Sequence, residues 1–369
     1  MLPALALRLR VRVLLALLAA AAVCLLATPA VRKFACKLGA MDLPGESRRI
    51  HDHPVPRLGG LALFAGFLAG ALPFTGVSEP VQGILLGSVI VVVTGAVDDL
   101  ISLSPWVKLV LQLAAAFVAI EHGVVIRILT NPSAASAETI ALGALSVPVT
   151  LVWIVGMTNA LNLIDGLDGL AAGVCGIGCA SMLAVSLFLP GATEVSVLLA
   201  ALGGACLGFL PFNINPAKIF MGDSGSLLLG YVLSTASVLG LFKMYTLVAF
   251  AVPVLTLALP LTDTVFAIVR RLYRGESPFK PDRGHIHHRL LALGLTQKQA
   301  VAVLYAASGI LGAAAVLLAA NAAARFWLLL AAVAVALGVW LYVFAGHHFP
   351  ADPGAKKKNG KKEDGAPKS

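Results

Sequence analysis

Charged side chains are scarce in this chain. Only 12% of its 369 residues are Asp, Glu, Lys or Arg, whereas 59% are hydrophobic and the mean hydropathy is +0.92. A water-soluble domain of this size needs more charge than this to cover its surface. The composition therefore argues against one or two soluble globular domains and indicates a polytopic membrane protein.

Cysteine is also scarce, and its spacing does not suit metal binding or a disulfide framework. The five cysteines lie mostly in apolar segments, and no two of them form a CxxC pair. We interpret them as small buried hydrophobic residues. The net charge of +9 alone would suit nucleic acid, but the basic residues lie between apolar runs, so no nucleic-acid partner is predicted.

What the chain does have is a series of apolar runs, each long enough to cross about 30 Å of hydrocarbon as a helix. They predict an all-α integral membrane protein, a bundle of about eleven transmembrane helices. One domain would cover 1–345, followed by a basic tail, 346–369, that we expect to be disordered. The expected spans are 11–30, 58–76, 81–98, 105–121, 141–161, 169–189, 195–212, 225–241, 245–269, 299–319 and 325–345.

The distribution of basic residues predicts the orientation of these helices. Most of the 27 lysines and arginines lie in 31–57, in 270–298 and in the tail, all on one side of the predicted membrane. The positive-inside rule places that side in the cytoplasm. Three arginines before residue 13 oppose this orientation, and they make 8–30 resemble a signal peptide with a cleavage site at Thr28–Ala30. We give the later loops more weight and leave open whether 1–30 are retained.

Unusual polar residues gather on this same side. In the densest group two amides and two carboxylates recur at intervals of three directly after an apolar run. Carboxylates at a membrane boundary are costly to desolvate, so such a group indicates a site. The mixture of acids, amides, histidines and basic residues suits a metal-bridged polyphosphate, because acid and amide oxygens hold Mg²⁺ while Lys and Arg bind phosphate. The groups are Arg48–Gly60, Asp98-Asp99 with Lys108, Asn159–Gly173, Asn213–Ser226 and Ser277–Arg289.

Each group also has a simpler interpretation. The Asp98-Asp99 pair would also suit a solvated helix end, and because adjacent helical positions point about 100° apart, the two should not bind one ion identically. The glycines after Asp165 would suit a helix stop. Asp223 would suit an N-cap, which is compatible with metal binding. Asp263, inside a predicted span, either packs against a neighbouring helix or makes a polar contact, and we favour packing.

The histidines after the ninth predicted span allow a zinc site, no role, or phosphate contact and proton transfer near neutral pH. A zinc site is disfavoured because no cysteine is near and His-x-His-His is not a usual zinc spacing.

Five motifs in order resemble the polyprenyl-phosphate N-acetylhexosamine-1-phosphate transferases (glycosyltransferase family 4), in the branch of the WecA and TagO enzymes. They are Pro-x-Pro-x-x-Gly-Gly, Asp-Asp, Asn-x-x-Asn-x-x-Asp-Gly-Leu-Asp-Gly, Met-Gly-Asp-x-Gly-Ser and His-Ile-His-His, from about Pro44 to Arg289. The resemblance implies that a lipid-linked phosphate attacks the sugar-bearing phosphorus of a UDP-sugar, so that a lipid diphosphate sugar forms and UMP leaves. It also implies Mg²⁺, with Mn²⁺ as an alternative, which agrees with catalysis by positioning and charge neutralisation.

The resemblance also implies roles for individual residues. Asp98 and Asp99 match an acidic pair proposed to deprotonate or to orient the lipid phosphate; we favour orientation, because a phosphate monoester has a second pKa near 6. Metal ligands would be Asp223 and Asn162. Catalytic residues would be Asp98, Asp99, Lys108 and His285. Substrate-binding residues would be Arg57, Asp165, Asp168, Asn213, Arg283, His287 and His288.

The donor and the membrane follow from the same resemblance. MraY-type enzymes carry His-His-His where this chain has His285-Ile286-His287-His288, which favours UDP-GlcNAc or a related UDP-N-acetylhexosamine over UDP-MurNAc-pentapeptide. The acceptor would be undecaprenyl phosphate in the bacterial inner membrane, with the site facing the cytoplasm. The downstream polymer, for example O-antigen, and the oligomeric state, for which a homodimer is one option, stay open.

Two other classes fit the composition less well. A secondary transporter would place acids near the midplane of broken helices and would show an internal repeat, whereas these acids lie at one interface and the halves show no repeat. A glycosyltransferase that uses a polyprenyl-phosphate sugar would commonly place its acids on the outer face.

Overall fold

The computed structural model describes residues 2–42, 54–130, 139–188, 192–240, 254–255, 257–273 and 286–320. These belong to one unit, Met1–Ala322. Part of the ninth predicted span, all of the eleventh and the predicted tail lie outside the described residues.

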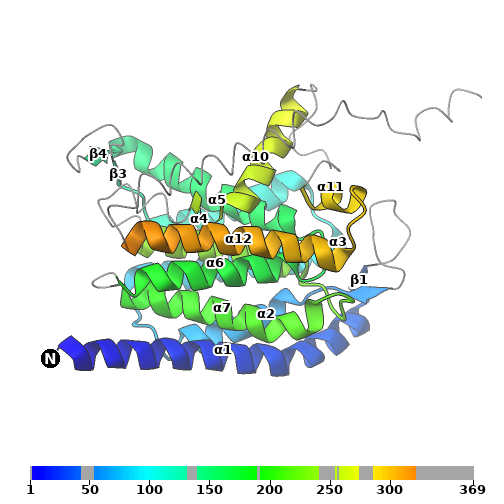
Figure 1. The fold of residues 1–369 in the computed structure, drawn as a ribbon, viewed down its shortest axis with the longest axis horizontal. Helices are drawn as coiled ribbons and strands as arrows, with labels where there is room; N and C mark the ends of the chain where they lie inside the picture. Colours follow the sequence, from blue (N-terminus) through cyan, green and yellow to red (C-terminus); the bar gives the residue numbers. More distant parts are fainter. Residues whose placement is uncertain are drawn as a thin grey trace, which may run out of the picture. The chain divides into compact units, whose positions relative to one another are not determined.

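Helices dominate the described part of the chain, as the apolar runs predict (Figure 1). Two short antiparallel hairpins pair β1 (Met41–Asp42) with β2 (Val55–Pro56) and β3 (Ile128–Thr130) with β4 (Thr139–Ala141), and a 3₁₀ turn covers Gly143–Leu145. The helices are α1 (Leu2–Leu38), α2 (Gly60–Ala71), α3 (Glu79–Ile101), α4 (Pro105–Glu121), α5 (Ser146–Ile164), α6 (Leu170–Ser186), α7 (Thr193–Asn213), α8 (Gly222–Gly240), α10 (Ala258–Tyr273), α11 (Ile286–Ala292) and α12 (Gln297–Ala320).

Several of these helices can cross a membrane. Five stretches are long and apolar enough by length and composition: four lie within α1, α3, α7 and α12, and one comprises the 3₁₀ turn and α5. α2 and α6 are apolar but shorter. The all-α membrane class is therefore supported, while the count of eleven spans stays a prediction.

Small residues let the helices pack closely. α1, α7, α6 and α12 follow one another as roughly parallel neighbours (Figure 1). At Gly204 and Gly208 of α7, an added Cβ would lie 2.3 Å from the carbonyl oxygens of Leu17 and Ala21 in α1. Only glycine allows these backbones to approach so closely, as is common between membrane helices.

α8 is the central helix and positions the polar residues. It packs against α3 and α5, and every residue from Ser224 to Leu239 is buried. The first turn of α8 therefore lies beside the last turn of α3 and the last turn of α5. This juxtaposition brings together three of the polar groups that the sequence singles out.

Candidate active site

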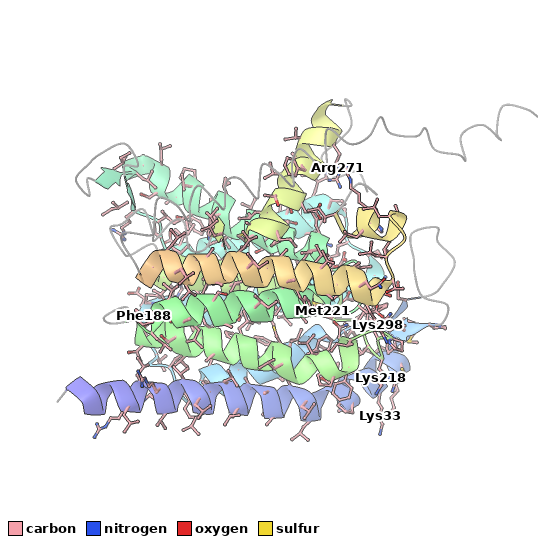
Figure 2. All side chains as sticks on the ribbon, viewed as in Figure 1. Lys33, Phe188, Lys218, Met221, Arg271 and Lys298 are labelled. Carbon is pink, nitrogen blue, oxygen red and sulfur yellow. The ribbon has the colours of Figure 1, made fainter. Side chains whose placement is uncertain are left out.

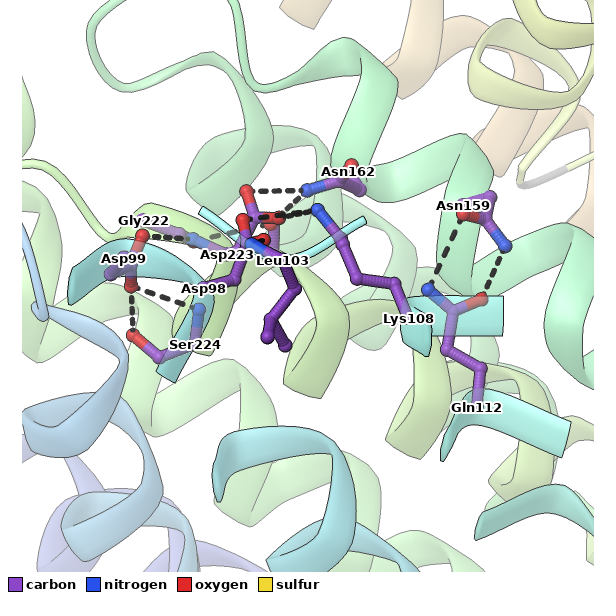
Figure 3. Close-up of polar contacts among 11 residues, drawn as sticks. Asp98, Asp99, Leu103, Lys108, Gln112, Asn159, Asn162, Gly222, Asp223 and Ser224 are labelled. Atoms are coloured by element: carbon purple, nitrogen blue, oxygen red, sulfur yellow. Dashed lines mark hydrogen bonds and ion pairs between the residues drawn. The ribbon is translucent and has the colours of Figure 1, made fainter. Parts of the chain in front are cut away.

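The candidate site is built around Asp223 in the first turn of α8. Lys108, in the first turns of α4, forms ion pairs with the Asp223 carboxylate and with Asp98 Oδ2, the latter at 3.2 Å (Figure 3). The three side chains are only 16% to 24% exposed, so they are mostly buried yet reachable by a ligand. Residues from three separate motifs, including Asn162, thus meet at helix ends as the motifs predict.

Asn162 ties the end of α5 to this cluster. Its Nδ2 donates to Asp223 Oδ1 at 3.0 Å (Figure 3). The same Nδ2 donates to Ser226 Oγ at 2.8 Å. An amide and a carboxylate from different helices are therefore held side by side, and the predicted metal site at these two residues stays a prediction.

The two adjacent aspartates have different surroundings. Asp98 accepts from the Leu103 backbone N–H at 2.7 Å and pairs with Lys108. It therefore belongs to the partly exposed cluster of Asp98, Lys108, Asn162 and Asp223, called the open cluster below. Asp99 is only 9% exposed and accepts from the backbone N–H groups of Asp223 and Ser224, at 2.9 and 3.2 Å. Neither carboxylate is a solvated helix end, and Asp99 supplies the N-terminal cap of α8 from a different helix.

The glycine motifs let three backbones meet at this point. A Cβ at Gly60 would lie 2.1 Å from the backbone nitrogen of Gly225, and a Cβ at Gly95 would lie 2.3 Å from that of Ser224. Gly222 has a positive φ of 68°, and a Cβ there would lie 2.3 Å from Asp99 Oδ2. Any side chain at these glycines would displace the start of α8 and, with it, Asp223.

The Pro-x-Pro-x-x-Gly-Gly motif is hydrogen-bonded to the residues just before α8. The Phe220 N–H donates to the Pro56 carbonyl at 2.9 Å, and the Gly60 N–H donates to the Met221 carbonyl at 2.8 Å. Arg57, predicted to bind substrate, forms an ion pair with Asp42 of β1. This ion pair does not test whether Arg57 contacts substrate, so that role stays a prediction.

Asp165 lies directly after α5 at the edge of the site. No described residue donates a hydrogen bond to its carboxylate. Burial in the protein, with the nearby carboxylates of Asp223, Asp99 and Asp168, raises the pKa of Asp165 to about 8, and Arg57 only partly offsets this. The raised pKa favours the protonated form of this carboxyl group, and its predicted contact with substrate stays a prediction.

Asp168 and Asn213 hold neighbouring loops in place. Asp168 Oδ2 accepts from Asn215 Nδ2 at 2.9 Å and from the Ala217 N–H at 3.0 Å. Asn213 is buried, accepts from the Gly169 N–H at 3.2 Å and donates to the Ile219 carbonyl at 3.0 Å. The geometry gives Asn213 a backbone-supporting role, and its predicted contact with substrate stays a prediction.

The histidine motif is only partly described. Arg283 and His285 lie outside the described residues, as does the side chain of His287, whereas His288 is half-buried on α11. Asp263 Oδ1 accepts from the Ile286 N–H at 3.0 Å, so α10 holds the backbone of the motif. The sequence favoured simple packing for Asp263, and this is wrong because the buried carboxylate caps α11 across the intervening loop.

One polar pair was missed by the sequence analysis. Gln112 and Asn159 exchange hydrogen bonds between their amide groups, and Asn159 Nδ2 also donates to the Val155 carbonyl at 2.8 Å (Figure 3). Gln112 lies one turn after Lys108, and Asn159 one turn before Asn162. The available signal was a lone glutamine within an apolar helix, because such a group needs a partner there.

The donor set suits a magnesium ion. Mg²⁺ is usually bound by one or two carboxylates together with waters and substrate phosphates, rather than by a full protein cage. Asp223, with the amide of Asn162 beside it, provides such a partial set. In the described part of the chain no three His, Cys, Asp or Glu side chains form a group that could hold a metal ion, so the magnesium site stays a prediction.

Comparisons with known proteins place this site in a family context. The sequence profile described as "Glycosyl transferase family 4" matches residues 81–241, which include Asp98, Lys108, Asn162 and Asp223. A Bacillus subtilis protein named probable undecaprenyl-phosphate N-acetylglucosaminyl 1-phosphate transferase is 41% identical over 319 residues, 86% of this chain and 87% of the relative.

Two further relatives carry related names. A Mycobacterium tuberculosis protein named decaprenyl-phosphate N-acetylglucosaminephosphotransferase is 37% identical over 323 residues, 79% of each chain. An Escherichia coli K12 protein named undecaprenyl-phosphate alpha-N-acetylglucosaminyl 1-phosphate transferase is 30% identical over 298 residues, 78% of each chain.

Proposed function

This chain belongs to glycosyl transferase family 4, and from this membership we propose that it transfers N-acetylglucosamine 1-phosphate to a polyprenyl phosphate. It is a multi-pass membrane protein. The observation that carries the proposal is the meeting of Asp98, Lys108, Asn162 and Asp223 at adjoining helix ends. Such a cluster can hold the two phosphate groups that must react.

In the proposed reaction the donor is UDP-GlcNAc and the acceptor is undecaprenyl phosphate. A nonbridging oxygen of the acceptor phosphate attacks the sugar-bearing phosphorus of the donor. The bond from that phosphorus to the oxygen bridging to the uridine-linked phosphate breaks, and UMP leaves with this oxygen. The products are a lipid diphosphate sugar and UMP.

Lys108 is placed to neutralise phosphate charge. Its ammonium group lies between two carboxylates, Asp98 and Asp223, so it is fixed in position before substrate arrives. Phosphoryl transfer depends mainly on positioning and on neutralising nonbridging oxygens. In this proposal the Lys108 ammonium contacts the diphosphate.

Asp98 orients the acceptor rather than removing its proton. The second pKa of a phosphate monoester is near 6, so the acceptor is largely ionised at neutral pH. Because Lys108 and the Leu103 N–H fix the Asp98 carboxylate, it can set the position of a cation or of the lipid phosphate.

Asp223 and Asn162 would hold Mg²⁺, with Mn²⁺ as an alternative. When bound, the metal would supply charge neutralisation and a fixed template for the diphosphate. Asp165 and Asp168 follow Asn162 in the sequence, and we propose that they bind the nucleotide. The histidine motif, including His285 and His287, is proposed to close over the diphosphate and sugar.

The names of the relatives favour this function over the alternatives. All three name GlcNAc phosphate transfer to a polyprenyl phosphate, which supports GlcNAc over MurNAc-pentapeptide. The acids also lie at helix ends, which supports an enzyme rather than a transporter. We further propose that the site faces the cytoplasm of a bacterial inner membrane, where a soluble nucleotide sugar and a membrane-bound acceptor meet.

The test is an assay of the purified protein with polyprenyl phosphate and Mg²⁺, offering UDP-GlcNAc or UDP-MurNAc-pentapeptide. We expect turnover with UDP-GlcNAc, release of UMP, and loss of turnover in EDTA that added Mg²⁺ restores. Glu79 carries an exposed carboxylate at the far end of α3, so Glu79→Gln serves as the control for Asp223→Asn. Release of UDP instead of UMP would exclude phosphosugar transfer, and preference for the pentapeptide donor would overturn the assigned substrate.

A further inference from the structure

The turn that carries Asp165 and Asp168 is held by α12, which lies outside the part of the chain matched by the family profile. Asn215 Nδ2 donates to Asp168 Oδ2 at 2.9 Å and also to Gln297 Oε1 at 2.7 Å. A continuous chain of hydrogen bonds therefore joins the first residue of α12 to the Asp168 carboxylate.

Each side of this junction has an exposed neighbour in sequence. Lys218, just after the Asn215 loop, and Lys298, next to Gln297, are both exposed (Figure 2). The junction between the loop and α12 therefore borders the exposed surface of the described unit.

A second contact from α12 reaches the same turn. The Tyr305 hydroxyl donates to the Gly169 carbonyl. A Cβ at Gly173 would lie 2.0 Å from the Tyr305 hydroxyl oxygen, so the ring fits only because this position is glycine. Gln297 and Tyr305 are about two helical turns apart and share one side of α12.

These contacts leave one oxygen of the Asp168 carboxylate available to a ligand. Both hydrogen bonds to Asp168 from described residues end on Oδ2, so Oδ1 can accept from a ligand. The donors are a neutral amide and a backbone N–H, so no cation among the described residues is paired with Asp168. The turn is thus fixed in direction by neutral donors that contact only one oxygen of Asp168.

We propose that Gln297 and Tyr305 are positioning residues for the nucleotide of the donor. α12 holds the Asp165–Gly169 turn so that its carboxyl groups meet the uridine portion of the nucleotide sugar. This inference rests on the proposed function. The acceptor side is built separately, because Asp98 and Lys108 come from α3 and α4, whereas α12 packs against α6, α10 and α11.

Tyr305→Phe and Gln297→Met separate this role from general stability. Each removes one hydrogen-bonding group and keeps nearly the same volume. We expect the KM for UDP-GlcNAc to rise about 3- to 10-fold in each variant, the loss typical of one hydrogen bond. The KM for polyprenyl phosphate should stay at the wild-type value, and the dissociation constant for UMP, measured by calorimetry, should rise by the same factor as the donor KM.

Matched controls exist elsewhere in the fold. Tyr231→Phe also removes a buried tyrosine hydroxyl that donates to backbone carbonyls, those of Gly83 and Ala115, both at 3.3 Å. Lys298→Ala changes an exposed neighbour of Gln297. Both controls should keep the wild-type KM for the donor even where Tyr231→Phe lowers the melting temperature.

The outcomes are distinct. A wild-type protein that releases no UMP would refute the proposed function itself. A wild-type protein that turns over normally, with Tyr305→Phe and Gln297→Met unchanged in donor KM and UMP affinity, would overturn the positioning role alone. Equal rises in the KM of donor and acceptor would also overturn it, because α12 would then support the whole fold. If Tyr305→Phe does not fold, the Gln297→Met result decides between these outcomes.

Discussion

The Asp99 carboxylate accepts a hydrogen bond from the Asp223 backbone N–H at 2.9 Å, across more than a hundred residues of sequence. The second carboxylate of the Asp-Asp motif thereby fixes the helix start that carries the central carboxylate of the site. Asp98, its neighbour, faces Lys108 instead. One motif thus combines a structural and a chemical role in consecutive residues.

This division predicts different defects in two matched variants. Asp99→Ala leaves buried N–H groups at the start of α8 without a partner, which should destabilise the protein by about 1–3 kcal/mol. Asp98→Ala removes a carboxylate from the open cluster and should lower kcat with little change in melting temperature. Thermal unfolding and steady-state kinetics in detergent measure both quantities. Equal melting temperatures for the two variants would contradict the assignment.

Asp165 predicts a dependence of stability on pH. Its pKa is about 8 in the folded protein and about 4 in an unfolded chain. Because the folded state keeps this proton longer, its contribution is fully present below the unfolded pKa and is lost as pH rises through about 8. As pH rises from about 5 to about 8, the melting temperature of Asp165→Asn, measured in EDTA, should therefore fall less steeply than that of wild type. Parallel curves for the two proteins would refute this.

Asp263 predicts a defect at the histidine motif. Its carboxylate accepts the Ile286 N–H, so Asp263→Leu should disturb the start of α11 and lower kcat/KM by about tenfold or more. Asp263→Asn keeps an acceptor oxygen and should retain most of the activity. Kinetics of the two variants, together with their levels in the membrane, test this. Equal activity of the leucine and asparagine variants would show that the hydrogen bond does not matter.

The Gln112–Asn159 pair predicts coupling between two helices. The two side-chain amides hydrogen-bond each other. Gln112→Leu or Asn159→Leu should therefore leave one amide unpaired and lower the free energy of unfolding by about 1–3 kcal/mol. The double variant should cost less than the sum of the single variants. A double-mutant cycle on unfolding measures the coupling energy. Additive effects would mean that the two amides do not stabilise each other.

Much of this arrangement could be predicted from the sequence. The apolar runs predict the helices well because a membrane span needs a long stretch of such residues, and α4, α5 and α7 lie close to their expected ranges. The motifs also predicted the meeting of Asp98, Lys108, Asn162 and Asp223. These residues combine types that are costly in a membrane protein and that are therefore rarely placed without a function.

The rest could not be read from sequence because it depends on tertiary contacts. Nothing local distinguishes Asp99 from Asp98, since the difference is which neighbouring helix each one faces. Tyr305 resembles an ordinary core aromatic residue until its hydroxyl is seen on the Gly169 carbonyl. Asp263 was assigned to packing because its partner, a backbone N–H, carries no sequence signal.

The fate of the sugar-bearing phosphorus of the donor distinguishes phosphosugar transfer from every alternative. UDP-GlcNAc labelled with ³²P at that position is incubated with polyprenyl phosphate, Mg²⁺ and either wild-type protein, Asp223→Asn or Glu79→Gln. The account predicts that wild type and Glu79→Gln move the label into the lipid fraction, whereas Asp223→Asn, at equal protein level, moves almost none. Label that stays in the water-soluble nucleotide with wild-type protein, or that reaches the lipid equally well with Asp223→Asn, would contradict it.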